Sequence, residues 1–524
     1  MKDLYASPAA LPSQLKNGAR CLQGLLARMA LLLALGGLLL QQAQAAVPPR
    51  LEQPVRSAES DSLEAVLARL RVQHLLALEG RQYGQDRDRE RREWLSAYRA
   101  YTLERDALIE AHYARQGKET KQQQSSDGSL SLQSVSGFDL VPDSVELRAL
   151  RDLYSSTGGE GWTHSTNWLT GTTSADFDTW YGVTVTNGDV TAIILSRNAL
   201  GDTIPSSLGE LSMLSYLHLN GNRLSGPVPE CLRSLPELQN LYLGQNSFSG
   251  PLPLWLGQLS KLQVLSLHDN ALTGGIPESL GNLAALTSLN LDGNRLSGGI
   301  PAALGRLTNL LSLYLSFNSL TGPIPDSLAN LTRLQHLDFY RNDLGGEVPD
   351  WLGDFSDLET LKLRSCGLSG PIPASLGNLS KLYYLSLRGN GLTGGIPESL
   401  GNLASMRNLY LSDNSLSGPV PGSLAALAVL ENLDLFTNKL EGGLPDFSAS
   451  PNRSSLNLRV QGNRLGFGVI EPNMTGAGTS AIGTFTYSPQ DDIPAPDTLG
   501  FTAGQPLELR AVTGGTRNLY QWQR

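Results

Sequence analysis

Side chains suited to metal binding or nucleophilic chemistry are few in this chain of 524 residues, which has six histidines and three cysteines. His218, His268 and His336 fall on predicted strands, and the first two lie two repeats apart, or roughly 10 Å. No carboxylate or cysteine completes a metal-ligand set around them, so we predict solvated histidines and no metal. The sequence has no glycine-rich phosphate loop, GxSxG motif or HExxH motif. We therefore expect no cofactor and no enzymatic activity.

The three cysteines do not predict a disulfide. Cys21 lies in an expected targeting segment, and Cys231 and Cys366 are more than five repeats apart, roughly 25 Å at about 4.8 Å per strand. A disulfide requires Cα atoms within about 7 Å. We therefore predict that Cys231 and Cys366 are free and buried.

The elements that position these side chains are repeats with a period of 24 residues, marked by asparagine. A cysteine replaces asparagine once, and the last unit is offset by one residue. The chain is acidic, with a net charge of −9 and a pI of about 5.3, and offers no electrostatic surface for nucleic acid. The predicted structural positions are Asn198, Asn222, Asn246, Asn270, Asn294, Asn318, Asn342, Cys366, Asn390, Asn414, Asn438 and Asn463.

Each position of a unit has a physical role, as residues 289–310 illustrate. Leu289 and Leu291 alternate with a polar residue, so both face inward from a short strand. Asn294 lies where the chain turns, and its amide can donate to and accept from buried backbone groups. Pro301 fixes φ, and the leucines at 304, 307 and 310 have near-helical spacing on the far side of the coil. A single unit cannot bury its leucines alone, so the units must stack.

The motif LxxLxLxxNxLxGxIPxxLGxL resembles the plant-type leucine-rich repeats of plant receptor ectodomains and of bacterial and algal proteins. The resemblance covers about residues 143–466. It implies an α/β solenoid, a right-handed superhelix with a parallel concave β-sheet, and a function in protein or peptide recognition. The sequence shows no kinase domain and no C-terminal transmembrane helix, so we do not expect a receptor kinase.

The order of segments follows from these patterns. We expect a signal peptide at 1–45, a charged helical segment at 46–114, a polar linker at 115–138, an N-terminal cap at 139–189, twelve repeats at 190–466 and a C-terminal tail at 467–524. Residues 29–40 form a short apolar run after Arg28, and residues 43–45 form a small-x-small cleavage site. We expect a secreted or cell-surface protein; a periplasmic location or an uncleaved membrane anchor is the alternative.

Both ends of the array carry distinctive residues. A capping box at 143–146 should start a helix of the cap, and Trp162, residues 167–169 and residues 180–183 resemble the cap of bacterial and algal relatives, without its plant cysteine pairs. A tryptophan-lined sugar pocket is the alternative for these aromatics. Residues 503–512 and Trp522 resemble the start of an immunoglobulin-like domain of about 100 residues, so we expect the chain to be a fragment.

Residues before, between and after the two strand leucines are predicted to project from the concave face. From the sixth unit these positions become aromatic and charged, and columns about 5 Å apart should form one exposed, locally basic patch. Tyrosine and arginine are common in interface hot spots, although both also simply suit exposed strands. The predicted ligand-binding residues are Tyr314, Phe317, His336, Asp338, Tyr340, Arg341, Lys362, Arg364, Tyr384, Arg388 and Tyr410.

We therefore expect an extracytoplasmic recognition or adhesion module that binds a protein, a peptide or an anionic glycan on its concave face. The alternative is a secreted inhibitor or accessory subunit of an extracellular hydrolase. We expect no nucleic-acid partner, and membrane contact only through an uncleaved N-terminal segment.

Overall fold

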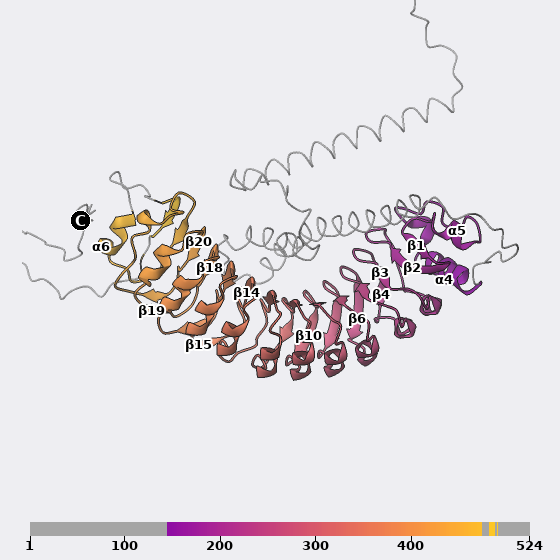
Figure 1. The fold of residues 1–524 in the computed structure, drawn as a ribbon, viewed down its shortest axis with the longest axis horizontal. Helices are drawn as coiled ribbons and strands as arrows, with labels where there is room; N and C mark the ends of the chain where they lie inside the picture. The colour runs from indigo at the N-terminus through magenta and orange to yellow at the C-terminus, as the bar shows by residue number, and fades with distance from the viewer. Residues whose placement is uncertain (1–143, 474–481, 488–489, 491–524) are drawn as a thin grey trace, which may run out of the picture. The chain divides into compact units, whose positions relative to one another are not determined.

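The computed structural model describes residues 144–473, 482–487 and 490 (Figure 1). Several predicted features lie outside these residues: the signal peptide, the charged helical segment, the linker, the start of the cap with Asp143, and the immunoglobulin-like stretch.

A sheet of 14 strands runs through the described repeats. The twelve predicted repeat strands are present and pair in parallel, with central leucines aligned, as for Leu289, Leu313 and Leu337. The predicted fold class is confirmed; the sequence did not predict the terminal strands β1 (antiparallel to β2) and β23. The strands are β1 (Val183–Thr186), β2 (Asp189–Ile194), β3 (Tyr216–His218), β5 (Asn240–Tyr242), β7 (Val264–Ser266), β9 (Ser288–Asn290), β11 (Ser312–Tyr314), β13 (His336–Asp338), β14 (Thr360–Lys362), β16 (Tyr384–Ser386), β18 (Asn408–Tyr410), β20 (Asn432–Asp434), β22 (Asn457–Arg459) and β23 (Thr484–Thr486).

Shorter parallel sheets follow the asparagine positions along the side of the array, and the sequence pattern did not reveal them. They form one sheet of five strands and two sheets of two strands each. Strands of two to five residues are too short to show a recognisable alternation. They are β4 (Ser225–Gly226), β6 (Ser247–Pro251), β8 (Ala271–Gly274), β10 (Arg295–Gly298), β12 (Ser319–Leu320), β15 (Ser369–Pro371), β17 (Gly391–Thr393), β19 (Ser417–Gly418) and β21 (Lys439–Leu440).

Short helices lie along the outer side of the curved array and the large sheet along its inner side (Figure 1). The predicted near-helical spacing of leucines is only partly helical: Leu304 lies in the single 3-10 turn η6, which follows Pro301 with φ −65°, whereas Leu307 caps that turn and Leu310 lies beyond it. None of the helices in the described residues could span a membrane. The α-helices are α4 (Ser144–Ser156), α5 (Ser174–Phe177) and α6 (Phe467–Ile470). The 3-10 helices are η1 (Gly159–Gly161), η2 (Ser206–Glu210), η3 (Glu230–Ser234), η4 (Leu254–Gln258), η5 (Glu278–Asn282), η6 (Ala302–Arg306), η7 (Asp326–Asn330), η8 (Asp350–Asp354), η9 (Ala374–Asn378), η10 (Glu398–Asn402), η11 (Gly422–Ala426), η12 (Phe447–Ala449) and η13 (Glu471–Asn473).

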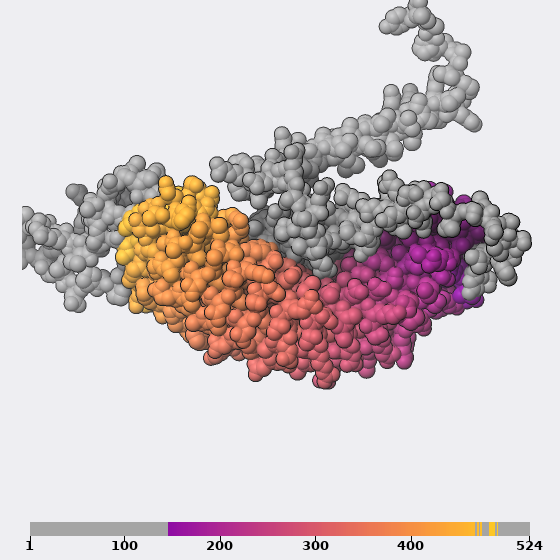
Figure 2. Space-filling view, in the orientation of Figure 1, coloured from indigo at the N-terminus to yellow at the C-terminus, as the bar shows by residue number. Residues whose placement is uncertain are grey.

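Each coil packs directly on the next, as the space-filling view shows (Figure 2). The inward leucines of strand and outer helix, such as Leu289, Leu291 and Leu304, are fully buried. The glycine of each LGxL segment permits this stacking. A Cβ at Gly305 would come within 2.2 Å of the carbonyl oxygen of Ser327 in the next coil, so glycine allows the outer helices to approach this closely.

The asparagines form a hydrogen-bonded ladder between coils. The Asn294 amide donates to the carbonyl oxygens of Leu267, Leu291 and Asp292 at 3.0–3.1 Å, and its Oδ1 accepts from the Leu272 N–H at 3.1 Å. One side chain therefore satisfies backbone groups of its own coil and of the preceding coil, which is the role that the sequence predicts for this position.

Asn294→Ala should lower the free energy of unfolding by about 1–3 kcal/mol, because the buried backbone groups that Asn294 satisfies lose their partner. The loss should be local, since each coil contacts only its neighbours. Urea denaturation followed by circular dichroism measures it, and Asn282→Ala, at the exposed end of η5, is the matched control. Equal stability of the two variants would contradict a structural role for the ladder.

Candidate functional site

The predicted ligand-binding residues gather on the face of the large sheet that points away from the leucine core. Six lie on strands, alternating with the buried leucines: Tyr314, His336, Asp338, Lys362, Tyr384 and Tyr410. Five lie in the turns that follow these strands: Phe317, Tyr340, Arg341, Arg364 and Arg388. Parallel pairing in register aligns the strand positions into columns, as for Tyr314 and Asp338.

These side chains are mostly buried, whereas the sequence analysis predicted an exposed patch. Nine of the eleven are buried, Tyr384 fully, and only Tyr314 and Arg341 have intermediate exposure. One reason is that large side chains of neighbouring coils in one column stand about 5 Å apart and cover one another. All eleven already take part in contacts or hydrogen bonds. A ligand that binds here must therefore replace some of these existing contacts with contacts of its own.

Aromatic rings and cations alternate along the face. The Phe317 ring lies 4.7 Å from the Tyr340 ring, and the Arg341 guanidinium is 5.6 Å from the centre of Phe317. Arg364 lies over the Tyr340 ring at 5.0 Å. Arginine over an aromatic face is stabilised by the ring quadrupole, so these contacts hold planar groups in fixed positions across neighbouring repeats.

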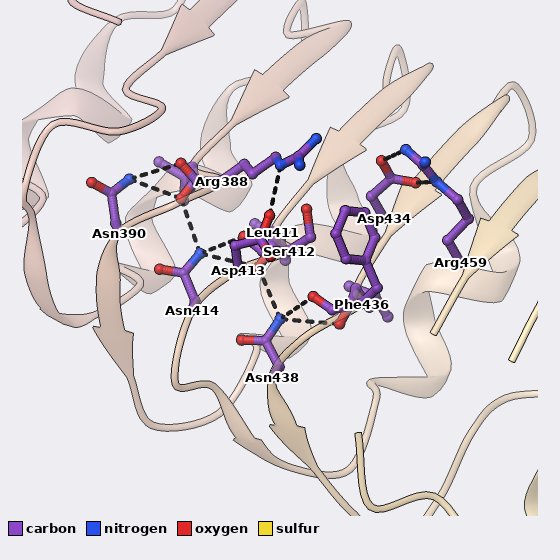
Figure 3. A network of polar contacts seen from close by, with 12 residues as sticks. Arg388, Asn390, Leu411, Ser412, Asp413, Asn414, Asp434, Phe436, Asn438 and Arg459 are labelled. Atoms are coloured by element: carbon purple, nitrogen blue, oxygen red, sulfur yellow. Dashed lines mark hydrogen bonds and ion pairs between the residues drawn. The ribbon is translucent and has the colours of Figure 1, made fainter. Parts of the chain in front are cut away.

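The row continues beyond the predicted residues, toward the C-terminal repeats (Figure 3). Phe436 lies between Arg388 and Arg459, each 5.0 Å from its centre. Phe436 occupies the column of Tyr340 and Arg364, and the small Ser412 stands between it and Arg388 in that column. Phe436 could have been predicted from the sequence, because it occupies the same position of its repeat as Tyr340 and Arg364.

Carboxylates partly neutralise the face, which the sequence analysis predicted to be locally basic. The Asp413 Oδ2 accepts a hydrogen bond from the Arg388 Nε at 2.8 Å, and the Asp434 Oδ1 accepts from the Arg459 Nε at 2.6 Å. The Lys362 Nζ lies 3.7 Å from the Asp338 Oδ2. Three cations of the face thus have an aspartate partner, and the face presents mixed charge.

The turn residue before each ladder position has a left-handed backbone. Glycine fills this position in several coils, as at Gly293 and Gly389, with φ of 65° and 69°. Phe317 and Arg341 adopt φ of 53° and 56° at the same position. The left-handed conformation costs a side-chain-bearing residue roughly 1–2 kcal/mol. Residues with side chains fill this position in eight of the twelve coils, so the conformation belongs to the repeat and does not by itself mark a ligand site.

The histidines and thiols do not form a reactive centre. His218, His268 and His336 are buried rather than solvated; His268 Nδ1 lies 2.8 Å from the Ser266 hydroxyl and His336 Nδ1 lies 3.1 Å from the Thr360 hydroxyl. In the described residues no three histidine, cysteine or acidic side chains are placed to hold a metal.

Cys231 and Cys366 are free thiols, as predicted, but of these two only Cys366 is fully buried; Cys231 has intermediate exposure because it lies on an outer helix. Desolvation raises the pKa of both thiols, so both remain protonated and weakly nucleophilic.

The cap tryptophans form a buried cluster. Trp162, Trp168 and Trp180 are at most 6% exposed, and their indole N–H groups donate to backbone carbonyls within the cap at 2.8–3.1 Å. Trp162 and Trp168 pack edge to face, with ring centroids 4.8 Å apart. This arrangement favours a capping role over a tryptophan-lined sugar pocket.

Family models match most of the array. The leucine-rich repeat region model matches residues 195–346, and two leucine-rich repeat models match residues 357–379 and 380–440. The chain is a leucine-rich-repeat protein. Its repeats span the whole face described above, so the aromatic and cationic row lies on the sheet of a leucine-rich-repeat solenoid.

Solved structures similar to this leucine-rich-repeat protein include plant receptor ectodomains. The ectodomain of the Arabidopsis thaliana receptor kinase GASSHO1/SCHENGEN3, in complex with CASPARIAN STRIP INTEGRITY FACTOR 2, is 34% identical with a TM-score of 0.58; the match covers 66% of this chain and 41% of that one. The Arabidopsis HAESA ectodomain with an extended IDA peptide hormone is 33% identical with a TM-score of 0.56, covering 61% and 53%. The chain thus spans about half or less of these ectodomains. No curated protein sequence matched.

Proposed function

We propose that the leucine-rich repeats bind a peptide or protein segment on the face that runs from β11 to β22, and that the protein acts by recognition rather than catalysis. The observation that carries the proposal is the aromatic and cationic row, in which the Arg341 guanidinium lies over the Phe317 ring and the Arg364 guanidinium over the Tyr340 ring. The similarity to ectodomains solved with ligands, including a peptide hormone, supports the proposal.

The ligand is a peptide of mixed character rather than a polyanionic glycan. Aspartates pair with Lys362, Arg388 and Arg459, so a uniformly negative ligand would meet carboxylates along the whole row. Aromatic rings such as Phe317 and Tyr340 offer apolar contact between the charged groups. A peptide with both apolar and charged side chains complements such a surface.

Random peptides displayed on phage and selected on the purified full chain test the proposal. We expect selected peptides to lose at least about 30-fold in affinity for the Tyr340→Ala/Arg364→Ala variant, on the order of 2 kcal/mol, because tyrosine and arginine anchors dominate interface energies. Calorimetry or biolayer interferometry measures the change.

The matched control is Arg333→Ala/Trp351→Ala, which removes an exposed arginine from the turn before β13 and an aromatic from the outer helix η8, neither of them in a strand of the face. Its affinity should equal that of the unaltered chain. Retained affinity in a folded Tyr340→Ala/Arg364→Ala variant, or a selection that enriches no peptide, would place the function elsewhere.

We also propose that the protein works outside the cytoplasm, on the strength of the apolar run at 29–40 and the cleavage site at 43–45. N-terminal sequencing of exported full-length chain should find a mature protein that begins after Ala45. A product that still carries residues 1–45 would support the membrane-anchored alternative.

A further inference from the structure

The ladder changes at one coil, where Cys366 replaces asparagine. In neighbouring coils the asparagine Oδ1 accepts from a leucine N–H of the preceding coil, as Asn342 does from Leu320 and Asn390 does from Leu368, at 3.0 and 3.1 Å. The Leu344 N–H has no such amide to bond and donates instead to the backbone carbonyl of Cys366 at 2.9 Å.

The thiol replaces only part of what an asparagine amide provides. The Cys366 Sγ lies 3.2 Å from the Phe339 carbonyl and 3.5 Å from the Arg364 carbonyl, and a thiol has one weak donor for the two acceptors. The same backbone carbonyl of Cys366 must serve the N–H groups of both Leu344 and Gly345. At this coil boundary a thiol and one shared backbone carbonyl therefore stand in place of the side-chain amide that holds the neighbouring coils.

The backbone also departs from the regular pattern here. Gly345, Gly346 and Gly367 have φ of 64°, 74° and 71°. Elsewhere in the array from Asn222 to Asn438 only the residue equivalent to Gly346 is left-handed in this part of the coil. Glycine raises the conformational freedom that a local opening gains.

The side sheet breaks at the same place. The five-stranded sheet ends at β12 and pairing resumes at β15; between them Thr321 pairs with Asp343 and Glu347 with Ser369 only as isolated bridges. The large sheet continues without interruption, with Leu337 of β13 paired to Leu361 of β14. Regular strand pairing therefore joins the two coils in the large sheet, whereas only isolated bridges join them in the side sheet.

We propose that the solenoid has a hinge at the Cys366 coil. The repeats up to Thr321 and those from Ser369 onward move as two blocks about the β13–β14 pair, and the side sheet between them opens. The Tyr340–Arg364 contact crosses this boundary, so the motion changes the curvature of the face at its centre. The hinge is a property of the chain without ligand and does not depend on the proposed binding function.

Hydrogen exchange of the full chain, read by mass spectrometry, tests the hinge. Peptides covering Leu344–Gly346 should exchange at least about tenfold faster than those covering Leu320–Gly322 and Leu392–Gly394, because the Leu344 and Gly345 N–H groups share one carbonyl and the side sheet beside them is reduced to isolated bridges. The second comparison is informative, since the side sheet is also interrupted between β17 and β19, but there Leu392 bonds to Asn414 at 3.1 Å.

Cys366→Asn should restore the ladder and slow exchange at Leu344–Gly346 by about tenfold. Cys366→Ser, which removes the thiol without adding an amide, should leave the fast exchange in place. Asn390→Cys should create a new fast segment at Leu368. Uniform exchange across the three coils of the unaltered chain, or no slowing in folded Cys366→Asn, would overturn the hinge.

Discussion

Trp180→Ala is expected to lower the free energy of unfolding of the N-terminal repeats by about 3–5 kcal/mol, the range for removing a buried tryptophan. The Trp180 ring is 1% exposed and contacts Phe177 and Trp168, with centroids 4.9 and 5.2 Å away. Its indole N–H donates to the Thr170 carbonyl at 2.8 Å, so the substitution also removes this hydrogen bond.

The effect should begin at the cap, because the first coil of a solenoid has a neighbour on one side only. Hydrogen exchange should therefore rise first at β1 and β2. Trp351→Ala is the control, since Trp351 is only partly buried on η8 and bonds to Asp326; about 1–2 kcal/mol is expected there. Equal losses in the two variants would show that the tryptophan cluster has no special role at the end of the array.

Asp434→Ala is expected to cost about 3–5 kcal/mol, because removing one partner leaves a desolvated charge behind. The Asp434 side chain is fully buried and that of Arg459 is 11% exposed, and the two form paired hydrogen bonds across β20 and β22. Arg459 also lies over the Phe436 ring, so its release should loosen the C-terminal end of the aromatic and cationic row.

Glu431→Ala is the matched control, three residues away. Its pair with Arg407 is exposed, at 39% and 52% of the two side chains, and such pairs contribute about 0–1 kcal/mol. Asp434→Ala combined with Arg459→Met should recover most of the lost stability, since the largely buried positive charge is then removed together with the aspartate. Urea denaturation compares the four chains; a double variant as unstable as Asp434→Ala would contradict the ion-pair explanation.

The candidate site was only partly visible in the sequence. The columns of Tyr340, Arg364 and Arg388 could be predicted, because strand alternation decides which side chains face outward. Their burial, the aspartate partners and the extension to Phe436 could not. Those features depend on how far each side chain reaches toward the next coils, as Arg388 does past Ser412 to Phe436.

The structure around Cys366 was also only partly predictable from the sequence. The sequence located it in the asparagine series and predicted a free buried thiol. The reassigned hydrogen bond of Leu344, the left-handed Gly345 and the broken side sheet appear only in three dimensions. The cysteine in place of asparagine changes the hydrogen bonds of backbone groups in the preceding coil. The sequence around position 366 does not reveal this change.

The 24-residue pattern was enough to predict the solenoid, its twelve strands and the face that carries the charged and aromatic residues. Each coil repeats one pattern and contacts only its neighbours, so a 24-residue period specifies the stacking. The tertiary structure decided which of those residues meet, which are strained, as Phe317 and Arg341 are, and where the ladder weakens. These properties depend on the distance of about 5 Å between coils. At that distance, side-chain length and backbone φ determine which residues of neighbouring coils come into contact.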